Sequence, residues 1–158
     1  MKFQFSLEKV LRHRHLQVDL AQRDFMEAQN FLRDEIAVLD NMKQLKQDSL
    51  QQRAQLVSAN QTWSPTIEQI NLYVNGQDLR IKNQNQRLLV IEKQVEEKRE
   101  ILRNASIEVK IIEKLKEKKF EEFKTEQQRK EQSELDELSV LRFSRNESLI
   151  KGSHEDGI

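Results

Sequence analysis

His13 and His15 are the residues of this chain that most resemble metal ligands. They stand two positions apart, in a stretch that the pattern below predicts to be helical. Side chains two apart on a helix point to different sides, whereas two ligands of one metal ion on a helix need a spacing of three or four. We therefore interpret both histidines as solvated surface residues and predict no metal site and no cofactor.

The sequence also lacks other features that are typical of enzymes. The chain has no cysteine, which excludes a thiol nucleophile, a disulfide scaffold and thiolate metal ligands. Carboxylates are plentiful, but the sequence holds no Gly-rich phosphate loop and no nucleophile elbow. The two-helix fold predicted below also offers no cleft that would exclude water and shift a pKa. We predict that the protein is not an enzyme.

The composition favours long helices. The 158 residues are 34% charged and include only three Gly and one Pro, too few turn-forming residues for a sheet-rich fold. Lys and Arg total 27 and so do Asp and Glu, and the two signs alternate along the chain. A nucleic-acid binder needs a basic face, so that class is excluded. No apolar run has the length of a signal peptide or of a membrane span, so we expect a cytosolic protein without direct insertion into a membrane.

A first helix is predicted over residues 6–59, with Ser6 as its N-cap. Its apolar residues recur at alternating spacings of three and four, which indicates one buried face. Arg14 and Glu35 interrupt this seam, and it weakens at Lys46, Ser49 and Arg53 before Leu56 resumes it. The apolar members of the seam are Leu7, Leu11, Val18, Ala21, Phe25, Ala28, Leu32, Leu39 and Met42.

A turn over residues 60–64 leads into a second helix over residues 65–149. Ser64 is suited to cap this helix, and Pro65 to be its first residue. Its seam runs from Ile67 to Ile112 with eleven apolar residues in fourteen positions. Asn75–Gly76 does not change its phase, so we expect at most a kink there. Residues 1–151 are interpreted as one domain and residues 152–158 as a disordered tail.

Two seams joined by a short turn predict an all-α fold, in which the helices form an antiparallel coiled-coil hairpin. Folding at the turn pairs positions whose numbers add up to about 123, such as Leu56 with Ile67 and Leu11 with Ile112. The two seams then end at the same level, which favours a hairpin within one chain over a parallel homodimer. The second helix would overhang this body at its C-terminus, from about Lys119 to Leu149.

The overhang is highly charged but contains spaced apolar residues. A lone helix of this kind is stabilised mainly by weak ion pairs one turn apart, so we expect it to fray unless a partner holds it. Its spaced apolar residues include Phe120, Phe123, Leu135, Leu138, Leu141 and Phe143.

Other apolar residues fall on the outer face of the predicted hairpin, where the partner helix cannot bury them. They gather at two levels, which indicates two partner sites. Near the turn these residues are Leu72, Tyr73 and Leu79, and near the open end they are Leu16, Leu20, Ile107 and Ile111. The alternative is that the overhang folds back over one of these patches.

Three stretches of the chain resemble the FliJ family of the bacterial flagellar export apparatus. The opening FQFSLEKVLRHRHLQVDLAQRDFMEA has the aromatic residues and the LEKVL-like phrase of that family. INLYVNGQDLRI follows the turn, and the charged C-terminal stretch ends in LDELSVLRF. Together they extend the resemblance over nearly the whole chain.

The resemblance implies a regulator of the hexameric flagellar export ATPase that acts as the central stalk of its ring, similar to the stalk subunits of rotary ATPases. It also implies contacts with the cytoplasmic domain of the export gate and with export chaperones, and a cytoplasmic position peripheral to the cell membrane. The gate contact would then be Leu72, Tyr73 and Leu79. The ATPase contact would be Leu16, Leu20, Ile107, Ile111, Phe120, Phe123, Leu138, Leu141 and Phe143.

Two other functions fit the pattern of residues. One is a generic coiled-coil tether or homodimeric structural protein, which light scattering would separate from a monomeric hairpin. The other is an export chaperone, which would form a stoichiometric complex with an unfolded secreted substrate.

Overall fold

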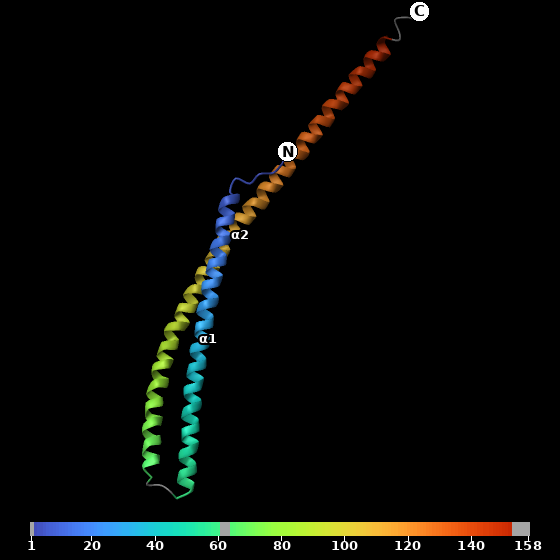
Figure 1. Cartoon of the computed structure of the whole chain (residues 1–158). Helices are drawn as coiled ribbons and strands as arrows, with labels where there is room; N and C mark the ends of the chain where they lie inside the picture. The colour runs from blue at the N-terminus through green and yellow to red at the C-terminus, as the bar shows by residue number, and fades with distance from the viewer. Residues whose placement is uncertain (1, 61–63, 153–158) are drawn as a thin grey trace, which may run out of the picture. The chain divides into compact units, whose positions relative to one another are not determined.

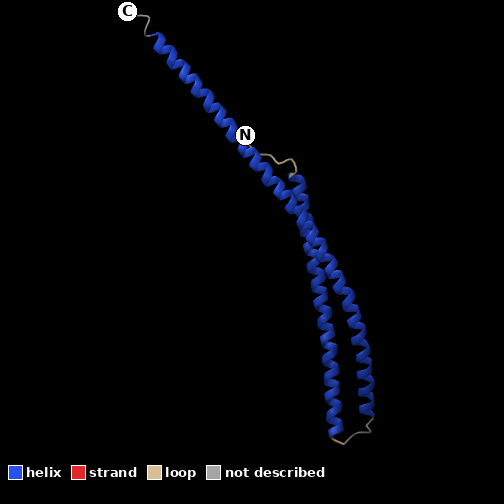
Figure 2. Ribbon diagram, turned by 180° about the vertical axis from the view of Figure 1, so that it is seen from behind, coloured by secondary structure: helices blue, strands red, loops and turns tan. Residues whose placement is uncertain are grey.

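The computed structural model describes residues 2–60 and 64–152, with side chains as far as Ser148. Over this part of the chain it contains two helices and no strand: α1 spans Glu8–Ser58 and α2 spans Pro65–Gly152 (Figures 1 and 2). The predicted all-α fold of two long helices is therefore confirmed. Residues 61–63 of the predicted turn and residues 153–158 of the predicted tail lie outside the described residues.

Local hydrogen bonds explain where the helices end and begin near the turn. The Asn60 N–H donates to the Val57 carbonyl at 3.1 Å, and Asn60 has a left-handed φ of 59°, which Asn adopts more readily than most residues. At the start of α2, the Ser64 hydroxyl accepts a hydrogen bond from the Thr66 N–H at 3.2 Å. The predicted Ser64 cap followed by Pro65 is confirmed, and α2 continues through Gly76 without a break.

The chain divides into two compact units. One consists of Arg12–Val109 and is called the hairpin unit below. The other combines Met1–Leu11 with Lys110–Ile158 and is called the terminal unit. Each is described by itself.

In the hairpin unit, α1 runs antiparallel beside α2, and the predicted seam positions form the interface (Figure 1). Lys46, Ser49 and Arg53 are half-buried at the expected spacing, so the α1 seam keeps its phase where its apolar character weakens. The buried apolar residues of this unit are Ala21, Leu39, Ile70, Val74, Leu88, Ile91, Val95 and Val109.

Contacts between the helices establish the register of the hairpin. Arg14 pairs with Glu108, and Lys46 pairs with Asp78 at 2.5 Å. The residue numbers of these pairs add up to 122 and 124, and those of Arg53 and Asn71, which are hydrogen-bonded at 2.8 Å, also add up to 124. The predicted register of about 123 is therefore confirmed.

A polar layer crosses the middle of this interface. The buried Gln84 donates hydrogen bonds from Nε2 to the Glu35 carbonyl oxygen at 3.0 Å and to Glu35 Oε2 at 2.7 Å. Arg87 pairs with the other carboxylate oxygen of Glu35 at 3.3 Å. The carboxylate that interrupts the α1 seam is thus satisfied from α2, as a buried polar group requires.

In the terminal unit, one part of α2 is covered by the N-terminal segment and another part is exposed. Residues 2–5 have no regular structure and pack on α2 from Lys116 to Phe123, so the pairing extends beyond its predicted end near Ile112. From residue 128 to residue 148 every described side chain is exposed. A C-terminal stretch of α2 on which no other described segment packs is therefore present, but it begins at residue 128 and not at the predicted Lys119.

Candidate partner-binding surfaces

No cluster of three or more His, Asp or Glu side chains suitable for a metal ion occurs within residues 2–60 and 64–148. His13 is exposed on α1. Along the described part of the chain, no helix is apolar enough over a sufficient length to span a bilayer. The features that remain for function are apolar surfaces and charge, and they occur at four places.

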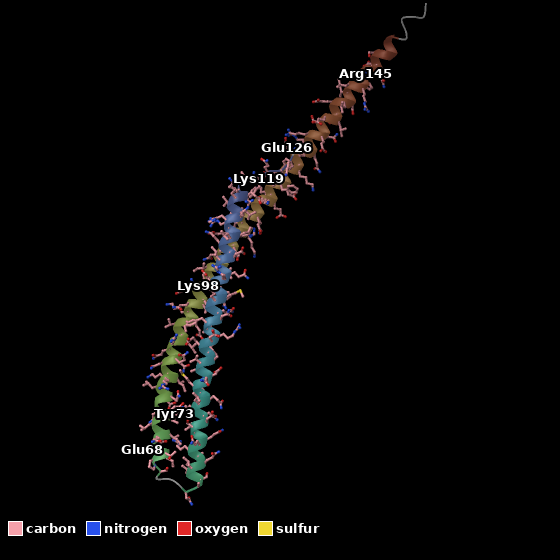
Figure 3. The ribbon with its side chains drawn as sticks, viewed as in Figure 1. Glu68, Tyr73, Lys98, Lys119, Glu126 and Arg145 are labelled. Carbon is pink, nitrogen blue, oxygen red and sulfur yellow. The ribbon has the colours of Figure 1, made fainter. Side chains whose placement is uncertain are left out.

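The first place, here called the turn-end surface, consists of Leu72, Tyr73 and Leu79 on α2. Leu72 and Leu79 are 68% and 61% exposed and lie two helical turns apart, so they share one face. Tyr73, labelled in Figure 3, accepts a hydrogen bond at its hydroxyl from Gln77 Nε2 at 2.7 Å. The hydrogen bond holds the Tyr73 ring toward Gln77, and all three predicted residues are exposed on the first turns of α2. Gln77 itself is buried, and its Oε1 has no hydrogen-bond partner among the described residues.

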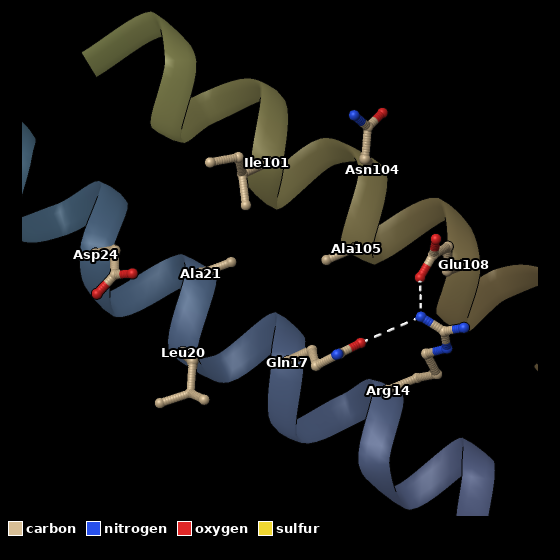
Figure 4. Close-up of a pocket in the computed structure, with 9 residues that line it drawn as sticks. All are labelled: Arg14, Gln17, Leu20, Ala21, Asp24, Ile101, Asn104, Ala105 and Glu108. Carbon is tan, nitrogen blue, oxygen red and sulfur yellow. Dashed lines mark hydrogen bonds and ion pairs between the residues drawn. The ribbon is translucent and has the colours of Figure 1, made fainter. Parts of the chain in front are cut away.

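The second place is a groove between α1 and α2 in the hairpin unit (Figure 4). The small side chains of Ala21 and Ala105 leave it hollow, and Arg14 closes one end by pairing with Glu108. Its remaining lining residues are Gln17, Leu20, Asp24, Ile101 and Asn104. Two alanines at seam positions are the signal in the sequence that predicts such a hollow.

The predicted open-end residues are all exposed, at separate positions of α1 and α2. Leu20 lines the groove, whereas Leu16 and Ile107, 55% and 47% exposed, are not among its lining residues. Ile101, 54% exposed, contributes an apolar side chain that the sequence analysis missed. Ile111 is 62% exposed and belongs to the terminal unit.

The third place is an aromatic cluster in the terminal unit. The Phe3 ring centroid lies 5.3 Å from that of Phe120, edge to face, and 5.5 Å from that of Phe123. These two predicted overhang residues are therefore partly covered by the chain's own N-terminal segment. Sequence reasoning missed this contact, although extending the register beyond Leu11 would have placed Phe3 opposite Phe120.

The fourth place is the exposed part of α2 beyond the cluster. Leu138, Leu141 and Phe143 are 52%, 64% and 72% exposed. Leu138 and Leu141 line a shallow groove together with Arg142 and Arg145, so apolar and basic side chains share one face. Leu135 and Val140 are exposed beside them.

Local ion pairs contribute to the charged character of α2 in this unit. Lys119 pairs with Glu122 one turn away at 2.7 Å, and its hydrogen bond and positive charge lower the pKa of that carboxyl group. Lys130 pairs with Glu126 at 3.9 Å. Such exposed pairs stabilise a helix only weakly. They do not cover Leu138, Leu141 or Phe143, which remain exposed.

Comparison with known proteins places the chain in a family. The model of the family described as flagellar FliJ protein matches residues 2–148, which includes both helices and the N-terminal segment. The flagellar FliJ protein of Bacillus subtilis is similar, with 25% identity over 144 residues that cover 90% of this chain and 97% of that protein. No solved structure matches the chain. Because the family match spans nearly the whole chain, this protein belongs to the FliJ family.

Proposed function

We propose that this chain is the central stalk of the hexameric ATPase of flagellar protein export and regulates that enzyme. In this role it links the ATPase ring to the cytoplasmic domain of the export gate and to export chaperones, at the cytoplasmic face of the membrane. Membership of the FliJ family supports a component of flagellar export. The finer assignment rests on the surfaces described above.

The observation that carries this proposal is the exposed stretch of α2 over residues 128–148. Its leucines and Phe143 are covered by no other described residue, and a helix this polar gains little from its own ion pairs. A ring that encloses the helix supplies an apolar surface for Leu138 and Leu141 and complementary charges for Arg142 and Arg145. Entry into the ring then orders the helix.

The turn-end surface is the proposed contact with the export gate. It exposes two leucines on one face beside the Tyr73 ring, which keeps a polar tip and an apolar body. It belongs to a different unit from the proposed ATPase contact on residues 128–148. The two partners therefore use different residues, and one can be impaired without the other.

Truncation after Gln127 tests the ATPase contact. This cut removes the exposed stretch but keeps Phe120 and Phe123, which hold Phe3. We expect the truncated chain to lose stimulation of the purified flagellar export ATPase while its helical melting transition is retained. The intact chain should also bind less tightly as salt rises, because charges lining the helix are screened beyond about 8 Å at physiological ionic strength.

A matched control is the intact chain with Leu72→Ala and Leu79→Ala, which should stimulate the ATPase as the unaltered chain does. Full stimulation by the truncated chain would show that residues 128–148 are not the contact. The hairpin groove around Ala21 and Ala105 would then be the surface to test.

A further inference from the structure

The N-terminal segment is held on α2 by side chains. Phe3 places its ring edge to face on Phe120 at an interplanar angle of 75° and also contacts Phe123. Such tilted and edge-on arrangements are the favoured geometries of aromatic pairs. Within residues 2–5, the backbone hydrogen bond formed is the one that the Phe5 carbonyl accepts from the Glu8 N–H at 3.2 Å. Recognition of this segment therefore depends on which side chains it carries.

Lys116 contacts two further side chains of the same segment, those of Phe5 and Glu8. Its Nζ lies 6.0 Å from the Phe5 ring centroid and 2.8 Å from Glu8 Oε2. One ammonium group thus makes a cation–π contact and an ion pair. Together with the aromatic cluster, this face of α2 selects two aromatic residues separated by one position and a carboxylate three positions later.

The side chains that hold this segment are partly exposed to solvent. The Lys116 and Glu8 side chains are 38% and 46% exposed, and Phe120 is also 46% exposed. Phe3 and Phe5 are half-buried. An exposed ion pair is screened by solvent, so the contact depends mainly on the partly covered rings.

We propose that the face of α2 from Lys116 to Phe123 is a binding surface for an aromatic and acidic segment of a partner protein, in which the chain turns after the second aromatic residue as it does after Phe5. The chain's own residues 3–8 occupy this surface until such a segment displaces them. The proposal rests on the proposed function only in that Phe120 and Phe123 belong to the predicted ATPase contact. The chemistry of the occupant comes from the segment that is seated there.

The test uses a synthetic peptide with the sequence FQFSLE and the full-length chain carrying Phe3→Ala and Phe5→Ala. These residues precede α1, so the substitutions leave both helices intact. In NMR titrations, the peptide should shift the amide signals of residues 116–123 in this variant with millimolar affinity. The unaltered chain should bind it about twofold more weakly, because its tethered segment has an effective concentration in the millimolar range, close to the dissociation constant of the peptide.

Two controls make the titration specific. A peptide with alanine at both aromatic positions should cause no shifts, and the chain with Phe31→Ala, an exposed residue of the hairpin unit, should behave like the unaltered chain. The proposal is wrong if the peptide fails to bind the variant, or if the shifts spread over exposed residues such as Leu141. This experiment contains no ATPase, so its failure is distinct from a failure of the proposed stalk function.

Discussion

The hairpin unit and residues 128–148 of α2 are both helical, yet their side chains have opposite surroundings. In the hairpin unit, Leu88 and Ile91 are 7% and 5% exposed because α1 lies against them. In the exposed stretch, Leu138 and Leu141 have the same spacing of three and are 52% and 64% exposed. The difference shows that spacing of apolar residues indicates a face, whereas only a facing element decides whether that face is buried.

The two regions also use polar residues differently. In the hairpin unit, Glu35 and Gln84 are joined across the interface. In the exposed stretch, the hydrogen bond from Gln132 to Asp136 at 2.9 Å connects neighbouring turns of one helix. The first kind of contact fixes the position of two helices, and the second supports only the local helix. An exposed apolar face with local support alone is the feature that points to a partner.

The largest expected difference between the regions is in stability. Ile91→Ala should lower the free energy of unfolding by about 2–4 kcal/mol, because it removes buried methyl groups and leaves a cavity. Leu141→Ala, in the exposed stretch, should change it by less than about 0.5 kcal/mol. Urea denaturation followed by circular dichroism measures both. Equal losses would mean that the exposed stretch is packed in solution.

A substitution in the polar layer should lower the free energy of unfolding by less than Ile91→Ala does. Glu35→Ala removes the carboxylate that receives Gln84 and Arg87, but Gln84 keeps its hydrogen bond to the backbone carbonyl of residue 35. We expect a loss of about 1 kcal/mol in the free energy of unfolding. Glu108→Ala is the control, because it removes an exposed pair with Arg14 and should cost less than about 0.5 kcal/mol. A smaller loss at Glu35 than at Glu108 would contradict a structural role for the layer.

The turn-end surface sharpens the comparison, since it lies in the well-packed unit but is itself exposed. Leu72→Ala together with Leu79→Ala should leave the free energy of unfolding within about 0.5 kcal/mol of its original value. The same variant should bind the cytoplasmic domain of the export gate more weakly in a calorimetric titration. A stability loss similar to that of Ile91→Ala would show that these leucines belong to the core.

The smallest effect is expected from a local pair on the exposed side of α2. Lys119→Met removes the hydrogen bond and the charge that lower the pKa of Glu122, so this pKa should rise. Because the pKa is lowered in the helix, the pair stabilises the helix above the usual pKa of Glu, and this contribution disappears as pH falls through the lowered value. An NMR titration of the Glu122 carboxyl group measures the shift. Lys130→Met should leave the Glu122 pKa unchanged, and an unchanged pKa in Lys119→Met would refute the assigned cause.

Most of the fold followed from the sequence, because a coiled coil repeats one spacing and a short turn fixes which positions meet. The partner of Gln84 did not follow, since seam position shows that a polar residue is buried but not which group satisfies it. The N-terminal contact was missed for a different reason. Phe3 and Phe5 precede the helix, so helical spacing does not assign them to a face, and only the antiparallel register extended beyond Leu11 places Phe3 opposite Phe120. The leucines of the turn-end surface were found because the outer face of a hairpin is defined by the same spacing as its seam.

The layer formed by Glu35, Gln84 and Arg87 also determines how the hairpin responds to a force directed along its helices. Sliding by seven residues would restore the apolar spacing but move Gln84 toward Ala28 or Met42, which offer a backbone carbonyl but no carboxylate. Loss of the bond to the Glu35 carboxylate costs about 1 kcal/mol, so the slipped arrangement is disfavoured. The pairs Arg14–Glu108 and Lys46–Asp78 must break in the same step, because they share this register. A force that pulls on one helix is therefore transmitted to the other helix, and the two helices do not slide past each other.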